Sequence, residues 1–254
     1  MEHNGIVSYE LAPLGDSAVI VRFGDLIDMA VNRLAISFAA LLENEPFPGM
    51  IECVPSYAAV AVHYDPVAVL VAIDEADRGE TIGDIVCNIL RRRLLRLQAV
   101  SPHKARTVTI PVCYGGEFGP DLAFVASHHD MSEEEAAAVH AAGTYTVYMI
   151  GFVPGFPYIG GLPERLATPR RSSPRTVVPA GSVGIGGAQT GIYPLASPGG
   201  WQLIGRTPLR LLRPEERSPS LLAAGDAIRF EPINREQYEA YECEENTSRT
   251  EDMR

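Results

Sequence analysis

Hydrophobic and polar positions in the first part of the chain follow two different periods. The run AVIVRF at 18–23 is rich in β-branched residues and predicts a strand. From 31 to 42 the apolar residues recur with a helical period, and Asp28 precedes them as a candidate helix cap. The pattern therefore predicts a strand followed by an amphipathic helix.

The alternation of strand and helix patterns continues to about residue 100. Strand-like runs at 50–54 and 57–64 are followed by a weaker helical pattern at 67–77 and a strong one from Thr81. The resulting order, βαββα, predicts a small two-layer α+β domain of the ferredoxin-like type over residues 1–100.

Beyond Ser101 the pattern changes to short strands separated by turns. Strands predicted at 108–112 and 145–150 flank a helix that Ser132 opens as part of a capping box and Gly143 ends. Further short strands are predicted at 176–178, 183–185, 191–193, 202–205, 209–212 and 227–230. Strands of this length and spacing are typical of a closed or nearly closed β-barrel.

The chain is therefore expected to have three parts. Residues 1–100 form the α+β domain, 101–233 form the β-barrel, and 234–254 form a C-terminal tail. The tail is highly charged and poor in apolar residues, which predicts a loose helix or a frayed end.

The charge of the segment 151–213 is opposite to that of the whole protein. The segment has one acidic residue, Glu164, and a local formal charge of +6, whereas the 254-residue chain has a net charge of −11. Its seven arginines are Arg165, Arg170, Arg171, Arg175, Arg206, Arg210 and Arg213. Clustered guanidinium groups in an acidic protein indicate recognition of an anion, because their planar fork matches carboxylate and phosphate oxygens. The alternative for any one arginine is a salt bridge to an acid elsewhere in the chain.

Composition excludes several kinds of protein. The acidic total argues against general nucleic-acid binding, and the basic run Arg91–Arg93 is better explained by the C-terminal end of a helix. The only lysine, Lys104, has no glycines at P-loop spacing, so P-loop chemistry is excluded. No apolar run is long enough to span a membrane and no signal peptide is visible, so we expect a cytoplasmic protein without membrane contact.

Metal binding is not indicated by the spacing of potential ligands. The four cysteines are far apart and form no CxxC motif, which favours reduced thiols. His128 and His129 are adjacent, and their side chains would point in different directions on regular structure. We therefore expect no metal site formed by this chain.

The glycine-rich run GSVGIGG at 181–187 is compatible with two explanations. Its spacing is not GxGxxG and no helix follows, so a dinucleotide-binding loop is disfavoured. Ser182 superficially resembles the serine of a nucleophile elbow, but an elbow also needs a following helix. Turns of a barrel, or close approach of backbone to a ligand, remain as explanations, with Ser182 as a hydrogen-bonding residue.

Other residues near the arginines could orient a small ligand. Gln189, Thr190 and Tyr193 provide polar groups, and Trp201, the only tryptophan, is either a core residue or a stacking surface. His140 lies at the end of the predicted helix, where it either complements the helix dipole or faces a cleft as an acid or base.

Long runs of the chain resemble the B-subunit family of 5-oxoprolinases, also described as allophanate hydrolase subunit 1 or as sporulation-kinase inhibitors. They include GFVPGFPYIGGLP, PRRSSPRTVVPAGSVGIGGAQTGIYP and SPGGWQLIGRTP, with LGDSAVIVRFG, PGMIECVPSYAAVAVHYDP, IPVCYGGEFGPDL and VYMIGFVPGF upstream. The resemblance extends over residues 14–233.

The resemblance implies a fold and an activity. The fold would be an N-terminal α+β domain followed by a cyclophilin-like β-barrel. The activity would be cleavage of 5-oxoproline to glutamate with ATP, carried out with a C subunit of related barrel fold and a third subunit. Phosphorylation of the lactam would make its oxygen a leaving group, a step that requires cations around phosphoryl oxygens. The family also includes kinase inhibitors and carboxyltransferase subunits of urea metabolism, which are the alternatives.

The resemblance and the charge pattern together give a set of expected site residues. Those expected to be catalytic are His140, Arg175, Gln189 and Arg206. Those expected to bind substrate or nucleotide are Arg170, Arg171, Ser182, Thr190, Tyr193 and Trp201. The segment 151–213 has too few carboxylates to hold the Mg²⁺ that accompanies ATP, so we expect the partner subunit to complete that site.

Overall fold

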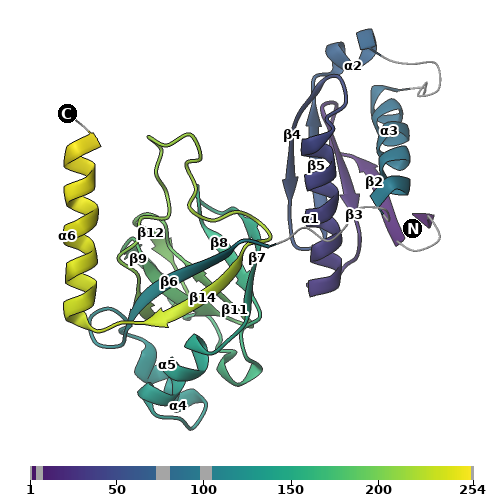
Figure 1. Ribbon diagram of the computed structural model, residues 1–254. Coiled ribbons are helices and arrows are strands. Elements are labelled where there is room, and N and C mark those ends of the chain that lie inside the picture. Colours follow the sequence, from purple (N-terminus) through teal and green to yellow (C-terminus); the bar gives the residue numbers. More distant parts are fainter. Residues whose placement is uncertain (1, 4–7, 73–80, 98–104, 253–254) are drawn as a thin grey trace. The chain divides into compact units, whose positions relative to one another are not determined.

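The computed structural model describes residues 2–3, 8–72, 81–97 and 105–252, with side chains described as far as 243 in the last of these ranges. The chain divides into two compact units, Met1–Lys104 and Ala105–Arg254 (Figure 1). Each unit has its own hydrophobic core.

The N-terminal unit contains a five-stranded sheet in the order β1-β2-β3-β5-β4. All neighbouring strands in it are antiparallel. The strands are β1 (Glu2–His3), β2 (Ser8–Pro13), β3 (Ala18–Arg22), β4 (Met50–Pro55) and β5 (Ala59–Tyr64).

Three helices accompany this sheet: α1 (Met29–Asn44), α2 (Pro66–Ala72) and α3 (Ile82–Arg96). The cap predicted at Asp28 and the helix start predicted at Thr81 are confirmed. Asp28 accepts hydrogen bonds from the first turn of α1, and Thr81 forms a capping box with Asp84 at the start of α3. The apolar faces of α1 and α3 pack on one side of the sheet. Of the weaker helix predicted at 67–77, residues 73–77 lie outside the described part.

The arrangement β3-α1-β4 with β5 between the two strands is a split β-α-β unit, which ferredoxin-like domains also contain. The strand on the other side of β3 is β2, which precedes this unit and was not predicted. The N-terminal unit is thus a two-layer α+β structure, and its ferredoxin-like class stays a prediction.

The second unit is built on a closed barrel with the strand order β10-β11-β8-β7-β14-β6-β13. Its strands are β6 (Thr107–Tyr114), β7 (Tyr145–Ile150), β8 (Pro157–Gly160), β10 (Ser182–Gly186), β11 (Gln189–Ile192), β13 (Gln202–Arg206) and β14 (Ala227–Pro232). β6 and β14 pair in parallel, which closes the barrel between the two ends of the unit. The barrel fits the cyclophilin-like fold that the family resemblance implies.

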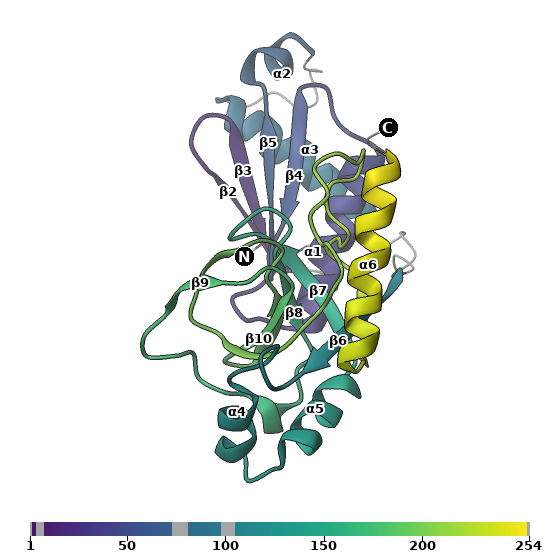
Figure 2. The ribbon, with the colours of Figure 1, turned by 90° about the vertical axis from the view of Figure 1, so that its left-hand side faces the viewer.

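Several elements lie outside the barrel strands. β9 (Arg175–Val178) and β12 (Ser197–Gly199) form a two-stranded ribbon. The helices α4 (Leu122–His128) and α5 (Glu133–Ala141) lie together at one end of the barrel (Figure 2), next to a 3₁₀ turn at Glu164–Leu166. The predicted charged tail contains α6 (Arg235–Asp252).

One strand prediction is wrong. Residues 209–212 form no strand, and the segment makes a single bridge from Leu212 to Ser220. Its alternating leucines reflect packing of an irregular segment, because Leu211 is buried in the barrel core.

No helix in the described part of the chain is both long and apolar enough to cross a bilayer.

Candidate functional site

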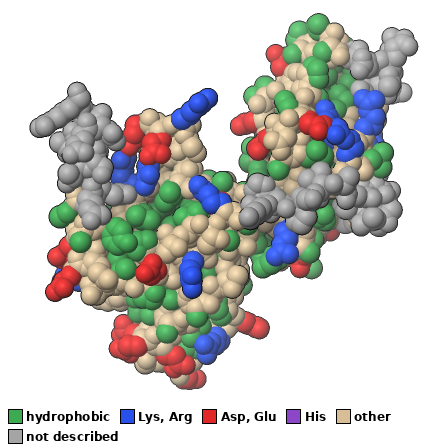
Figure 3. Space-filling view, viewed as in Figure 1, with side chains coloured by type: hydrophobic (Ala, Val, Ile, Leu, Met, Phe, Trp, Pro, Cys, Tyr) green, Lys and Arg blue, Asp and Glu red, His purple; other side chains and the backbone are tan. Residues whose placement is uncertain are grey.

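The expected site residues all lie in the barrel unit and, with the exception of Gln189, fall into three groups. One lies inside the barrel, one lies on its outer surface beneath the β9–β12 ribbon, and one lies on its outer surface beside α6. The surface of the barrel unit carries side chains of both charges (Figure 3), and the acidic ones include Glu133, Glu134 and Glu135 in the first turn of α5.

His140 and Thr190 are brought into direct contact inside the barrel. The imidazole Nε2 of His140 lies 3.0 Å from Thr190 Oγ1, and its Nδ1 lies 2.8 Å from the hydroxyl of Tyr114. Thr190 Oγ1 also donates to the carbonyl of Gly184 at 3.0 Å. Because this bond uses the only hydroxyl proton of Thr190, the threonine accepts from Nε2–H, and Nδ1 accepts from Tyr114.

This chain of hydrogen bonds fixes His140 as a neutral imidazole. The side chain is completely buried, and burial lowers the pKa of His140 from 6.5 to about 3. Tyr145 donates a further hydrogen bond to the His140 carbonyl and joins the same aromatic cluster. His140 therefore links α5 to two barrel strands, and it can affect a substrate only through the groups that surround it.

The glycines of β10 and β11 make room for the indole of Trp201. A Cβ on Gly186 would lie 2.6 Å from the Trp201 ring, and one on Gly191 would lie 2.9 Å from it. The ring is buried and makes edge contacts with Phe156 and Tyr158. The sequence predicted that a ligand could approach the backbone closely at the glycine run 181–187. In the structure the side chain of Trp201 occupies that position.

Two of the expected arginines bind one buried carboxylate. Asp121, which precedes α4, accepts hydrogen bonds from Arg171 Nη1 at 3.0 Å, from both Arg175 Nη atoms at 2.8 Å, and from the Leu203 backbone at 2.7 Å. Two guanidinium groups share one carboxylate, so the cluster keeps an excess positive charge. Asp121 holds the arginine loop against the barrel.

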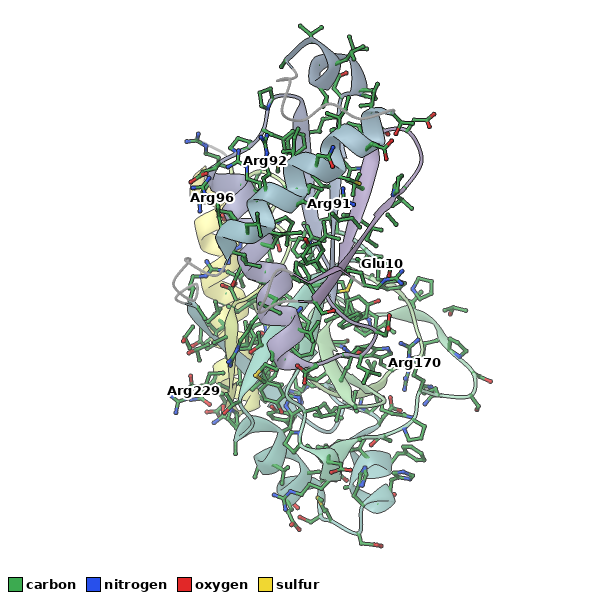
Figure 4. All side chains as sticks on the ribbon, turned by 90° about the vertical axis from the view of Figure 1, so that its right-hand side faces the viewer. Glu10, Arg91, Arg92, Arg96, Arg170 and Arg229 are labelled. Atoms are coloured by element: carbon green, nitrogen blue, oxygen red, sulfur yellow. The ribbon has the colours of Figure 1, made fainter. Side chains whose placement is uncertain are left out.

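Arg170 extends this positive group toward solvent. It is exposed, has no ion pair among the described side chains, and lies 5.8 Å from the centroid of the Trp201 ring. Figure 4 shows it on the side of the barrel unit opposite Arg229. Burial raises the pKa of Tyr193, while a backbone hydrogen bond from Trp201 and the nearby charges of Arg170 and Arg175 act in the other direction. Arg170, Arg171, Arg175, Tyr193 and Trp201 thus form one region, which we call the arginine face.

Ser182 and Arg206 form the third group. They are directly opposite each other on β10 and β13, and their side chains share the outer face of the barrel. Gln189 belongs to none of the three groups: it begins β11 opposite Gly186, at the other end of β10 from Ser182, and is partly buried. The Tyr193 backbone N–H donates a hydrogen bond of 2.9 Å to the Ser182 carbonyl, so the third group adjoins the arginine face through the backbone.

The segment's remaining arginines are partly neutralised within the chain. Arg210 pairs with Glu215 at 2.7 Å and Arg213 with Glu216 at 3.2 Å, both near the surface. The charge excess of this segment therefore lies at the arginine face, at Arg206 and at the exposed Arg165.

The residues that hold the expected ones in place were not predicted. Asp121, Tyr114 and Tyr238 are far from their partners in sequence, so no local spacing indicated them. The signal available for Asp121 was its place in GPD, immediately before an apolar run, facing a chain segment of opposite charge.

Comparison with protein families gives a match over most of the chain. The family model described as carboxyltransferase domain, subdomain C and D, matches residues 9–222. The 5-oxoprolinase B subunit from Bacillus subtilis (strain 168) is 48% identical over 240 residues, which are 94% of this chain and 99% of that protein. The protein of the same name from Escherichia coli O157:H7 is 42% identical over 86% of this chain and 94% of its own length.

Solved structures also resemble this chain. The crystal structure of TTHA0988 has a TM-score of 0.70 and 37% sequence identity over 85% of this chain. The match covers only 40% of that longer protein. The fold described above is thus shared with one part of a larger molecule.

Proposed function

Because the chain belongs to the B-subunit family of 5-oxoprolinases, within the larger carboxyltransferase domain family, we propose that it is one subunit of an ATP-dependent 5-oxoprolinase. It acts with a barrel-containing C subunit and a third subunit to convert 5-oxoproline to glutamate. The observation that carries this proposal is the near full-length similarity to proteins of that name, together with the net positive arginine face.

The arginine face fits an anionic ligand in composition. Its guanidinium groups exceed its carboxylates, and the exposed Arg170 is the group of this face with most access to solvent. Both 5-oxoproline, through its carboxylate, and ATP, through its phosphates, present oxyanions that guanidinium groups bind. We assign Arg170 to direct contact with such an oxyanion, and Arg171 and Arg175 to supporting positive charge.

ATP would transfer a phosphoryl group to the lactam oxygen and release ADP. Addition of water to the activated carbon with cleavage of the ring C–N bond would leave an acyl phosphate, and a second water would release phosphate from it to give glutamate. This chain's part is electrostatic. Positioned cations stabilise the charge that develops on the phosphoryl oxygens. We assign the same role to Arg206, and to Gln189 that of an uncharged hydrogen-bond donor to the same oxygens. His140 is a positioning residue that acts through Tyr114 and Thr190.

Magnesium does not fit the residues that the structure describes. Among the described residues there is no group of three histidine, cysteine, aspartate or glutamate side chains that could hold a metal ion. Asp121, the buried carboxylate nearest the arginine face, is fully used by its arginines and Leu203. We therefore assign the metal to the partner subunit and no step to it here.

The test is ATP hydrolysis by the reconstituted complex. This chain is co-expressed with its partner subunits, and ATP hydrolysis is measured with and without 5-oxoproline. The proposal expects 5-oxoproline-dependent hydrolysis that disappears when this chain is omitted. A complex that assembles but hydrolyses ATP equally with and without 5-oxoproline would contradict it.

Arginine variants assign the site within that assay. Arg170→Ala, Arg175→Ala and Arg206→Ala should each lower turnover by about tenfold or more, because one lost contact to a developing charge costs at least that factor. The matched control is Arg210→Ala, which removes an arginine of the same segment from a surface pair with Glu215. Equal rates for the control and the three variants would remove these arginines from the site.

A further inference from the structure

Over residues 235–243, the C-terminal helix α6 is attached to the barrel unit by very little buried surface. Among residues 235–243, whose side chains are described, Tyr238 alone is buried and every other side chain is exposed. The helix begins beside β6 and runs along the outside of the barrel (Figure 1). In this described part, Tyr238 is the one buried anchor, and exposed Arg235 adds an ion pair with Glu117. A segment held in this way can separate from its support at small cost, because most of its surface is already in water.

Tyr238 contacts two residues that belong to the barrel. Its ring lies 4.6 Å from the ring of Phe118, and its hydroxyl lies close enough to Arg206 for that group to lower the pKa of the phenol. Burial raises the pKa of Tyr238 to about 12, with Glu242 adding to the effect and Arg206 opposing it. The phenol is therefore neutral, and it occupies one side of a guanidinium group that has no carboxylate partner among the described side chains.

A row of buried and half-buried side chains crosses three adjacent barrel strands, starting from β6, the strand that α6 contacts. Ser182 on β10 is opposite Arg206 on β13, and Arg206 is opposite Cys113 on β6. Cys113 lies close enough to Arg235, in the first turn of α6, for that charge to influence its thiol. All three members of the row thus lie on the outer face, on the side of the barrel where α6 begins.

Two polar atoms in this row are buried without a hydrogen bond. Neither Ser182 Oγ nor Arg206 Nε has a partner in the described structure. A buried donor without a partner costs about 1–3 kcal/mol, more when it is charged. Ser182 O–H and Arg206 N–H are both donors, and they project from directly opposed positions, so one group with oxygen acceptors could satisfy both.

We propose that Ser182 and Arg206 form an oxyanion-binding site that α6 covers, and that Tyr238 keeps the cover in place. The ligand class is a phosphate or carboxylate oxyanion, since only acceptor oxygens with negative charge match a guanidinium group and a hydroxyl donor together. The inference rests on the proposed function only for the identity of the natural ligand. It adds that this part of the site is closed in the isolated chain and opens when α6 moves.

The charges on α6 agree with a closed state that excludes anions. Arg235 is paired with Glu117 and Glu239, and Glu242 lies next to the Tyr238 hydroxyl. These carboxylates oppose the entry of a further negative charge while the helix is in place. Displacement of α6 removes Glu239 and Glu242 and leaves Arg206 on the barrel.

The cover is tested by the reactivity of Cys113. This thiol is buried beneath the start of α6, so alkylation by iodoacetamide, located by mass spectrometry, reports displacement of the helix. In a Cys243→Ser background, Tyr238→Ala should raise the alkylation rate of Cys113 by about tenfold or more, as expected when a local opening becomes easier. Tyr241→Ala is the matched control, because it makes the same change at an exposed site of the same helix. Equal rates for the two variants would overturn the role of Tyr238.

The site itself is tested by titration with inorganic phosphate, with acetate as the carboxylate probe. Tyr238→Ala should bind phosphate or acetate about fivefold more tightly than the unaltered chain, because the state in which α6 covers the site no longer competes with anion binding. Tyr238→Phe, which keeps the ring and removes the hydroxyl from Arg206, should show a smaller gain and guards against misfolding of the alanine variant. The gain should vanish when Arg206→Gln or Ser182→Ala is added.

If the gain in affinity for phosphate or acetate persisted after Arg206→Gln, the proposed site would be wrong. It would also be wrong if neither Tyr238→Ala nor Tyr238→Phe bound the anion more tightly than the unaltered chain. These measurements use neither ATP nor 5-oxoproline. Failure of the proposed enzymatic function would leave them unchanged, and failure of the covered site would leave 5-oxoproline-dependent hydrolysis intact.

Discussion

His140 on α5 and Thr190 on β11 are 50 residues apart in sequence and share a hydrogen bond of 3.0 Å inside the barrel. The hydroxyl of Thr190 donates its hydrogen bond to the carbonyl of Gly184, so the imidazole must donate to Thr190 through Nε2–H. The contact therefore determines both the position and the tautomer of the histidine. It also makes the barrel sensitive to acid.

Stability of the barrel unit should fall on acidification because of His140. Burial lowers its pKa from 6.5 to about 3, so the unfolded chain takes up a proton below pH 6.5 while the folded chain does not. The corresponding stability is fully present above pH 6.5 and declines as the pH falls toward 3. Between pH 7 and pH 5 the loss should be about 2 kcal/mol, measured by urea unfolding followed through Trp201 fluorescence.

Two variants isolate this effect from that of other titrating groups. His140→Asn should remove about 2 kcal/mol of the stability difference between pH 7 and pH 5. Thr190→Val should be less stable by about 1–3 kcal/mol at both pH values, but it should keep the full pH dependence. If His140→Asn and the unaltered chain lose the same stability on acidification, the histidine is not buried as a neutral group.

Asp121→Asn should destabilise the barrel unit and loosen the arginine loop. The substitution keeps the shape of the side chain but removes the charge that Arg171 and Arg175 share. Because both arginines are partly exposed, we expect a loss of about 2–3 kcal/mol in unfolding free energy. Asp130→Asn is the control, since Asp130 is exposed and its left-handed backbone suits asparagine. If Asp121→Asn lost no more unfolding free energy than Asp130→Asn, the contacts of Asp121 with the two arginines would contribute no stability.

Gly186→Ala should displace the indole of Trp201. The added methyl group would lie 2.6 Å from the ring, so the ring or the strand must move, at a cost of about 1–3 kcal/mol. The tryptophan emission should shift to longer wavelength as the ring becomes more exposed. Gly200→Ala is the matched control, since its methyl group would meet Pro174 at an ordinary 3.6 Å. An unchanged emission spectrum in Gly186→Ala would contradict the glycine-lined position of Trp201.

Arg170→Gln should change the fluorescence of Trp201 with little effect on stability. The guanidinium group lies 5.8 Å from the ring centroid and is exposed, so its contribution should be about 0.5–1 kcal/mol. The emission intensity and its quenching by iodide should both change, because the arginine attracts the anionic quencher to the ring. Identical iodide quenching before and after the substitution would show that Arg170 does not lie over the indole.

Local signals in the sequence determined which elements could be predicted. The strand at 145–150 and the helix start at Thr81 follow from period and capping, and both are found as predicted. β8 was not predicted, because its four residues, PYIG, include a proline and a glycine. α4 escaped because it is short and lacks a side-chain cap: the carboxylate of Asp121, which precedes it, binds arginines instead.

The charge pattern located the candidate site but not its internal pairing. Clustering of Arg170, Arg171 and Arg175 could be expected from their shared loop. Their neutralisation by Asp121 could not, because the partner lies about fifty residues earlier and is brought close only by the packing of α4 against β13. The glycine run 181–187 was ambiguous for a similar reason. Glycines are needed whether a ligand or the indole of Trp201 approaches the backbone, so the sequence alone does not distinguish the two.

The parallel pairing of β6 with β14 has a consequence for synthesis of the protein on the ribosome. Thr107 pairs with Ala227 and Val112 with Pro232, so β6, the first barrel strand to be synthesised, can pair with β14 only after the last barrel strand has been made. Until then both neighbours of β14 remain open edges, which invite pairing with other chains. The nascent barrel should therefore be the part of this polypeptide that most depends on chaperones, whereas the sheet of the first unit is complete once residue 64 has emerged.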